Sequence, residues 1–274
     1  MNKATRLILP SGAELPAIIF LIGLAGSGWG TATAADPDAA TIIARSMAAN
    51  EGDWAAAPSY SYEENVRNDD GARTYEVVIL AGTPYKRLTS VNGSPLTGDE
   101  KKKEDEKLAR ERARRETESR DARAQRLQEY ERTRDRVHRI LVEMPRAFEY
   151  QLAATRRVSS RKVYVLRATP QPAYDPPNAE AEVLTGMSGE FWIDAGTYQW
   201  VRAFAHVLHP VEIDGFLAKV QPGTEFEVEQ MHVDGGVWLP RHLEIRSRAS
   251  IFFLFPHHSF EDHTYSNYRK SPAL

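Results

Sequence analysis

The residues with the most obvious chemistry are three histidines near the C-terminal end of the chain. His257 and His258 are adjacent, His263 follows on what we expect to be the next strand, and imidazole nitrogens are common zinc ligands. The histidines flank an apolar run at an expected hairpin turn, and the sequence has no cysteine to complete a zinc site. We therefore interpret them as surface or hairpin residues and predict no metal centre.

Sequence signatures of catalysis are also missing. The chain has no Gly-x-Ser-x-Gly nucleophile turn, no His-Glu-x-x-His motif, no phosphate-binding glycine loop and no dinucleotide fingerprint. Its carboxylates are numerous, but nearly all lie on one highly charged segment or on the polar faces of expected strands. Because no isolated acid–base pair stands out, we expect no catalytic residues and no cofactor.

Residues 1–34 have the order of a secretory signal peptide. Lys3 and Arg6 make the N-terminus positive, an apolar run follows from Leu15 to Leu24, and a small-residue segment ends at Ala34. The apolar run is shorter than the roughly 20 residues that a helix needs to cross a membrane. We expect cleavage near Ala34 and a soluble mature protein in the periplasm.

The remaining residues, 35–274, are enough for one large domain. The sequence lacks cysteine, so disulfides cannot support that domain and its own core must hold it. The formal net charge is -3 and the isoelectric point is near 6.3, which does not favour nucleic acid as a partner. Charge is concentrated in one segment at about 98–144, which we interpret as a helical insertion in the single domain.

The first part of this domain predicts a short helix and an antiparallel meander. Over residues 38–50, apolar residues recur at helical spacing, with Asp38 in position to cap the helix. From Tyr60 onward the period changes to two, and residues 74–80 and 85–91 are rich in β-branched and aromatic side chains. Glycine-containing turns separate these segments, so we expect three antiparallel strands.

The charged segment predicts one long helix with two different halves. Thr97 opens a capping-box pattern and Pro145 is expected to end the helix. Residues 101–126 have almost no apolar side chains, so this half should project into solvent, either as a solvated face or as an arm that docks on a protein partner. The second half should dock on the sheet through one apolar face, made of Leu127, Tyr130, Val137, Ile140, Leu141 and Met144.

The last third of the chain is patterned almost entirely as strands. We expect a short strand at 162–167 and long ones at 189–194, 197–208, 224–233, 237–255 and 259–270. Apolar and polar residues alternate along most of them, which indicates one core face and one solvated face. The alternation leaves open which face of 197–208 is buried. So much sheet has more apolar area than two helices can cover, so either the sheet curls or something else fills its concave side.

The chain resembles the outer-membrane lipoprotein-sorting proteins, a group that includes the LolA-like periplasmic carriers. The resemblance rests on the signal peptide, the short helix before the strand with Tyr60 and Tyr62, the hairpin from Phe191-Trp192-Ile193-Asp194 to Trp200, and Gly236-Val237-Trp238-Leu239-Pro240 at the start of a long strand. It covers the late strands well and the early part of the chain loosely. The charged insertion is not part of the carrier pattern, and no family site is transferred residue by residue.

The resemblance implies an α+β fold: a mainly antiparallel β half-barrel, unclosed and covered by helices, with an apolar cavity for acyl chains. Residues of the expected concave face and its helical cover are the candidate ligand-binding set. A second set could form an apolar lip that contacts a partner or, transiently, a membrane. The cavity set is Ile42, Ile43, Met47, Tyr60, Tyr62, Phe191, Ile193, Phe226, Val228, Leu243 and Ile245, and the lip set is Phe216, Leu217, Phe252, Phe253 and Phe255.

These observations predict a non-catalytic periplasmic carrier that holds the acyl chains of a lipoprotein or lipid. Burial of the chains would drive capture, at about 0.8 kcal/mol for each buried methylene. The alternative is an envelope-sensing or regulatory module of the same fold, in which the charged helix at about 98–144 binds a protein partner.

Overall fold

The computed structural model of the chain describes residues 36–213, 218–251 and 255–271, without the side chains of 212–219 and 248–258. The expected signal segment 1–34 and four residues of the expected lip, Phe216, Leu217, Phe252 and Phe253, lie outside the described residues. Phe255 begins a strand, but its side chain is not described. Among the described helices, none is long and apolar enough to span a membrane.

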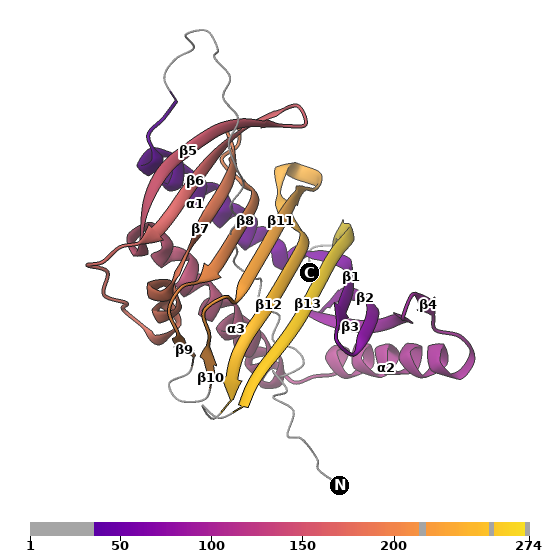
Figure 1. Cartoon of the computed structure of the whole chain (residues 1–274). Helices are drawn as coiled ribbons and strands as arrows, with labels where there is room; N and C mark the ends of the chain where they lie inside the picture. Colours follow the sequence, from indigo (N-terminus) through magenta and orange to yellow (C-terminus); the bar gives the residue numbers. More distant parts are fainter. Residues whose placement is uncertain (1–35, 214–217, 252–254, 272–274) are drawn as a thin grey trace.

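One antiparallel sheet organises the described part of the chain (Figure 1). Eleven strands follow each other across it in the order β4-β3-β2-β1-β13-β12-β11-β8-β7-β6-β5, and the short β9 and β10 join beside β12. Because β4 and β5 stay unpaired with each other at opposite ends of this order, the sheet is unclosed. The strands are β1 (Tyr60–Asn68), β2 (Gly71–Leu80), β3 (Thr83–Val91), β4 (Ser94–Pro95), β5 (Phe148–Val158), β6 (Arg161–Pro170), β7 (Met187–Asp194), β8 (Trp200–Val207), β9 (Val211–Ile213), β10 (Ala218–Val220), β11 (Glu225–His232), β12 (Trp238–Ile251) and β13 (Phe255–Lys270).

Helices α1 and α3 cross one face of the sheet, and we call this face concave (Figure 1). The sheet and its helical cover together confirm the expected α+β half-barrel. The described helices are α1 (Ala39–Ala56), α2 (Gly98–Glu116) and α3 (Arg120–Ala147), with short 3-10 turns η1 (Ala57–Ser59), η2 (Ala179–Gly186) and η3 (Asp234–Gly236).

The main core lies between the concave face of β6 to β8 and the helices. Phe191 and Leu166 from the sheet are fully buried against residues of α1, α3 and η2. Each fully buried side chain of this size contributes about 1.5–3 kcal/mol to folding. The contributing helical residues are Ile42 and Ile43 from α1, Met144 from α3 and Leu184 from η2.

The charged segment differs from the expected single helix. It is broken at residues 117–119, and Ser119 starts α3 by accepting a hydrogen bond from the backbone of Ala122 at 3.2 Å. The expected capping box is wrong, since Thr97 makes no side-chain cap. Pro145 does not end the helix either, because it lies in the last turn of α3, where the chain passes directly into β5 at Phe148.

Residues 101–126 do not project away from the fold as expected, although most side chains of α2 are exposed, as expected for a solvated helical face. Helix α2 lies along β3, with Leu108 buried, and the Arg87 guanidinium on β3 reaches Asp105. Arg115 is buried and donates to the carbonyls of Leu80 and Thr83 at 2.7 and 2.9 Å. The apolar pattern missed this docking because the contacts are mainly charged side chains that satisfy a strand turn.

Two features of the strands were not predicted. Strand β5 was not predicted, yet it pairs with β6 over its whole length. In β8, Trp200 and Ala203 both lie in the core although they are three residues apart. The register of β7 against β8 shifts here and leaves Val201 as an extra residue. Such a β-bulge changes the parity of the strand, which the sequence left open.

Candidate functional site

A cavity of about 650 Å³ lies between the C-terminal half of α1, helix α3 and the concave side of β1, β11, β12 and β13. The volume is within the range of about 300–1,000 Å³ that is usual for small-molecule sites. The walls are rich in aromatic rings, and we call this space the aromatic cavity. The rings are Trp54 from α1, Tyr130 from α3, Tyr60 and Tyr62 from β1, and Tyr265 and Tyr268 from β13, in addition to Trp200 and Trp238.

The strand side of the aromatic cavity is a cluster of tyrosines. The Tyr62 ring lies 5.8 Å from that of Tyr265 and 5.3 Å from that of Tyr268, between ring centroids. Tyr60 donates its hydroxyl to the carbonyl of Asp234 at 3.1 Å, and Tyr268 donates to a second carbonyl, that of Pro240, at 2.6 Å. All four tyrosines line the cavity, and the hydroxyls of Tyr60 and Tyr268 are satisfied by backbone, as buried tyrosines require.

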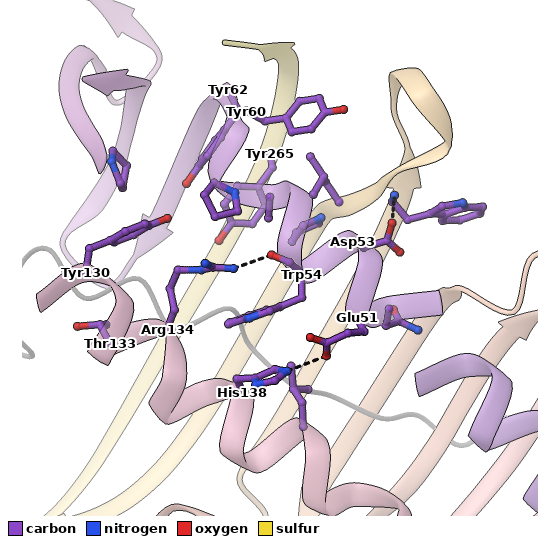
Figure 2. A pocket seen from close by; sticks show the side chains of 18 of the residues that line it. Glu51, Asp53, Trp54, Tyr60, Tyr62, Tyr130, Thr133, Arg134, His138 and Tyr265 are labelled. Atoms are coloured by element: carbon purple, nitrogen blue, oxygen red, sulfur yellow. Dashed lines mark hydrogen bonds and ion pairs between the residues drawn. The ribbon is translucent and has the colours of Figure 1, made fainter. Parts of the chain in front are cut away.

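The helix side joins α1 to α3 through polar contacts (Figure 2). Arg134 donates to the carbonyl of Trp54 at 2.6 Å, and its guanidinium lies 4.8 Å from the centre of the Trp54 ring. His138 Nε2 lies 2.7 Å from Glu51 Oε2, and the His138 ring stacks on Trp54 at 5.7 Å.

Asp53 is a buried carboxyl in the wall of the aromatic cavity. Its Oδ1 accepts the backbone N–H of Trp238 at 2.8 Å, and its Oδ2 has no hydrogen-bond partner of acceptable geometry among the described residues. Burial raises the pKa of Asp53 to about 6, against the lowering effects of Trp238, Gln199 and His232. The group is therefore an acceptor that changes its protonation state close to neutral pH.

A second buried group of charges lies beyond Tyr265 on the concave face. Glu64 is almost fully buried, with His263 Nδ1 2.8 Å from its Oε1 and Lys86 Nζ 2.5 Å from its Oε2. Burial lowers the pKa of His263, but hydrogen bonds and charges of Glu261 and Glu64 outweigh it and raise the pKa to about 9. The imidazole is thus held as a cation between two carboxylates, while His263 stacks on Tyr265 at 6.1 Å.

The opposite, convex face brings potential metal ligands together in the described part of the sheet. His242, Glu244 and Asp262 each offer one atom, and these atoms lie within 4.8 Å of one another. However, Arg67 binds Asp262 at 2.7 Å and Arg246 binds Glu244 at 2.7 Å. Since both carboxylates already have cationic partners, we interpret the group as a cross-strand charge network. His263 faces the other side of the sheet.

The eleven residues of the expected cavity set fall into three groups. Met47, Tyr60, Tyr62 and Val228 line the aromatic cavity. Phe226 and Ile245 are partly buried and pack against the main core. The other five are buried within the core, where helices and η2 cover them: Ile42, Ile43, Phe191, Ile193 and Leu243.

Sequence reasoning missed most of the polar and aromatic lining. Tyr130, Arg134 and His138 recur at intervals of four on α3 and therefore share one helical face. Tyr130 was expected on the docking face of this helix, and the same spacing is a usable signal for Arg134 and His138. Asp53 and the cluster around Glu64 gave no sequence signal, because their burial depends on strands that are far away in the chain.

Comparisons with known proteins give distant matches of the fold only. No protein-family model and no curated protein matches the chain. A LolA superfamily protein from Nitrosomonas europaea is 10% identical with a TM-score of 0.30, over 87% of this chain and 95% of that one. A putative outer membrane lipoprotein-sorting protein domain from Vibrio parahaemolyticus is 10% identical with a TM-score of 0.35, over 86% and 93%. A DUF1329 family protein from Desulfovibrio piger is 13% identical with a TM-score of 0.31, over 88% and 95%.

Proposed function

We propose that this protein is a non-catalytic periplasmic carrier that binds an acyl chain of a lipoprotein or lipid in the aromatic cavity. One observation carries the proposal, namely a cavity of about 650 Å³ on the concave face whose strand side is lined by aromatic and aliphatic side chains, with charged residues of α1 and α3 on its helix side. Large apolar pockets with a few polar groups are the usual form of small-molecule sites. Transfer of the chain out of water supplies the affinity, at about 0.8 kcal/mol for each buried methylene.

The chain of the ligand lies against Tyr62, Val228 and Met47, beneath the α1–α3 contact at Trp54 and Arg134. This location differs from the centre of the expected cavity set, since Phe191 and its neighbours are already in contact with α1, α3 and η2. A ligand there would have to displace packed side chains, whereas the aromatic cavity is open without any displacement.

We prefer a carrier to an envelope-sensing module. That alternative needs the charged segment to be free for a protein partner, but α2 packs along β3 through Leu108, and Arg115 is buried against a strand turn. Two charged residues of α2, Asp105 and Arg115, therefore contact the sheet of the same chain. Release of the ligand would follow separation of α1 from α3 at the Arg134–Trp54 and His138–Glu51 contacts.

The test is mass spectrometry of lipid extracted from the mature protein, purified from the periplasm without detergent. An acyl-containing molecule in near-stoichiometric amount supports the proposal. A Tyr62→Arg variant, which places charge in the cavity, should copurify with much less of it, while Arg110→Ala on the exposed side of α2 should not change the yield. Protein that is free of lipid, and that gains none when incubated with envelope lipids, would contradict the proposal.

A further inference from the structure

Four buried polar atoms in residues of the aromatic cavity wall have no hydrogen-bond partner among the residues that the structure describes. They are two acceptors, Asp53 Oδ2 and Gln230 Oε1, and two donors, the indole Nε1 atoms of Trp200 and Trp238. Buried polar groups in native proteins are nearly always paired, so a group of unpaired ones needs an explanation. Asp53, Trp200 and Trp238 are each more than nine-tenths buried.

The four residues gather at one end of the cavity. Trp200 begins β8, Gln230 lies near the end of β11 and Trp238 begins β12, and these three strands are neighbours in the sheet. Because the strands are antiparallel, the start of β8, the end of β11 and the start of β12 lie at the same edge. Asp53 joins them from α1 through its hydrogen bond with the Trp238 backbone.

Two β-bulges occur beside this group. Opposite β7, the register places Val201 as an extra residue next to Trp200. Opposite β11, Glu229 pairs with His242 while Gln230 pairs with Pro240, so Arg241 is also an extra residue. Bulges re-aim neighbouring side chains and are common next to binding sites. The bulge at Val201 turns Trp200 into the concave side, 5.1 Å from the Phe191 ring.

Because two of the four atoms are acceptors and two are donors, a ligand group that pairs with all of them must both donate and accept hydrogen bonds. A phosphate or carboxylate has no proton for Asp53 or Gln230, and an ammonium group has no acceptor for the two indoles. A hydrocarbon offers neither. A hydroxyl both donates and accepts, and several hydroxyls on one head group can meet several partners, whereas a secondary amide has a single proton.

We propose that this end of the aromatic cavity binds a neutral head group with several hydroxyls, attached to the acyl chain that the proposed function places in the rest of the cavity. The inference rests on that proposed function and adds the class of ligand. Ligands of glycerol or sugar type fit, and free fatty acids do not. The raised pKa of Asp53 agrees with this assignment, because burial of the carboxyl outweighs the lowering effects of Trp238, Gln199 and His232.

The experiment compares the binding of three probes to the mature protein, each with an unbranched saturated chain of equal carbon count: 1-monopalmitoylglycerol, palmitate and hexadecyltrimethylammonium. Each probe, below its micelle concentration, displaces the neutral dye N-phenyl-1-naphthylamine, and fluorescence gives the affinity. We expect 1-monopalmitoylglycerol to bind about tenfold or more tightly than the other two, the ratio that one buried hydrogen bond to a charged acceptor provides.

Two variants test whether the preference for 1-monopalmitoylglycerol depends on the four unpaired atoms. Asp53→Asn keeps an oxygen for the Trp238 amide and replaces Oδ2 by a donor, and Trp200→Phe keeps the ring but removes the N–H. Each should weaken 1-monopalmitoylglycerol about tenfold and leave palmitate nearly unchanged, while Arg110→Ala should change neither. Thermal melting checks that each variant is folded. If Asp53→Asn does not fold, Trp200→Phe alone tests the inference.

The outcomes separate this inference from the proposed function. If neither the dye nor any probe binds, the cavity does not take acyl chains and the proposed function fails. If the dye and palmitate bind, but 1-monopalmitoylglycerol has no advantage or both variants leave its advantage intact, the carrier function stands and the inference is overturned. The four atoms would then be satisfied by water.

Discussion

The concave face of this sheet is filled in one half and hollow in the other. Under β6 to β8, Phe191 and Leu166 belong to one core cluster with Met144 and Leu184, and all four side chains are fully buried. Under β1 and β13, four tyrosines line the open space, and the hydroxyls of Tyr60 and Tyr268 are fixed by backbone carbonyls. Aliphatic side chains keep their place only by packing, which closes the space between sheet and helix. A ring anchored at its far end keeps its place without a neighbour, so space can remain.

The largest test of this comparison is truncation of one aromatic residue in each half. Phe191→Ala should lower the free energy of unfolding by about 3–5 kcal/mol, because it leaves a cavity in closed packing. Tyr62→Ala should cost about 1 kcal/mol, since its ring is only half buried and already faces open space. Urea unfolding measures both. Equal losses would show that the hollow half is packed like the core.

Asp53, in the wall of the hollow half, should make the stability of the protein depend on pH. Its pKa is 3.8 in the unfolded chain and about 6 in the folded protein, so the folded state binds the proton more tightly between these values. Its contribution to stability therefore falls as pH rises from about 4 to about 6, by roughly 3 kcal/mol. Asp53→Asn should be more stable than the parent at pH 7 and similar to it near pH 4. A constant difference between the two proteins across this range would contradict the assignment.

Asp53→Asn should also bind 1-monopalmitoylglycerol more weakly than the parent protein does. Greater stability with poorer binding is the pattern expected where a site keeps an unpaired buried group for its ligand. A variant that loses both would instead indicate that Asp53 serves mainly to hold Trp238.

His263 should show the opposite dependence on pH. Its pKa rises from 6.5 to about 9 on folding, so its contribution is complete below pH 6.5 and is lost as pH increases through 9. The expected loss is of the order of 3 kcal/mol. His263→Gln should remove this slope, whereas His206→Gln on the convex face, where the ring bonds Ser188, should retain it. Parallel stability curves for the parent and His263→Gln would refute the charge assignment.

The smallest expected effect concerns the docked charged helix. Arg115→Ala should destabilise the protein by about 1–3 kcal/mol, because it leaves the carbonyls of Leu80 and Thr83 buried without their donor. Arg110→Ala, whose side chain is exposed on the same helix, should change stability by less than about 0.5 kcal/mol. Thermal melting of the two variants tests the docking. Equal melting temperatures would mean that α2 is held elsewhere.

Local pattern was sufficient for most of the fold. Alternation identified the strands that begin at Tyr60 and Trp238, and helical spacing identified α1. Local pattern failed where one extra residue, Val201, changed which face of a strand is buried. It also failed where a charged side chain, that of Arg115, packs against the sheet. In both cases the deciding interaction involves a partner strand that the local sequence does not specify.

The sequence by itself determined the class of most elements and the apolar faces of strands such as β7, β11 and β12, because these follow from side-chain periodicity along the chain. Only the tertiary structure decided which apolar positions became solid core and which became cavity wall. Phe191 and Tyr62 both lie on strands where apolar and polar residues alternate. Residues of α3 and η2 pack in the same core cluster as Phe191, whereas Tyr62 lines the aromatic cavity. Whether a face is filled depends on the volume of side chains that distant elements bring to it, and periodicity carries no information about that volume.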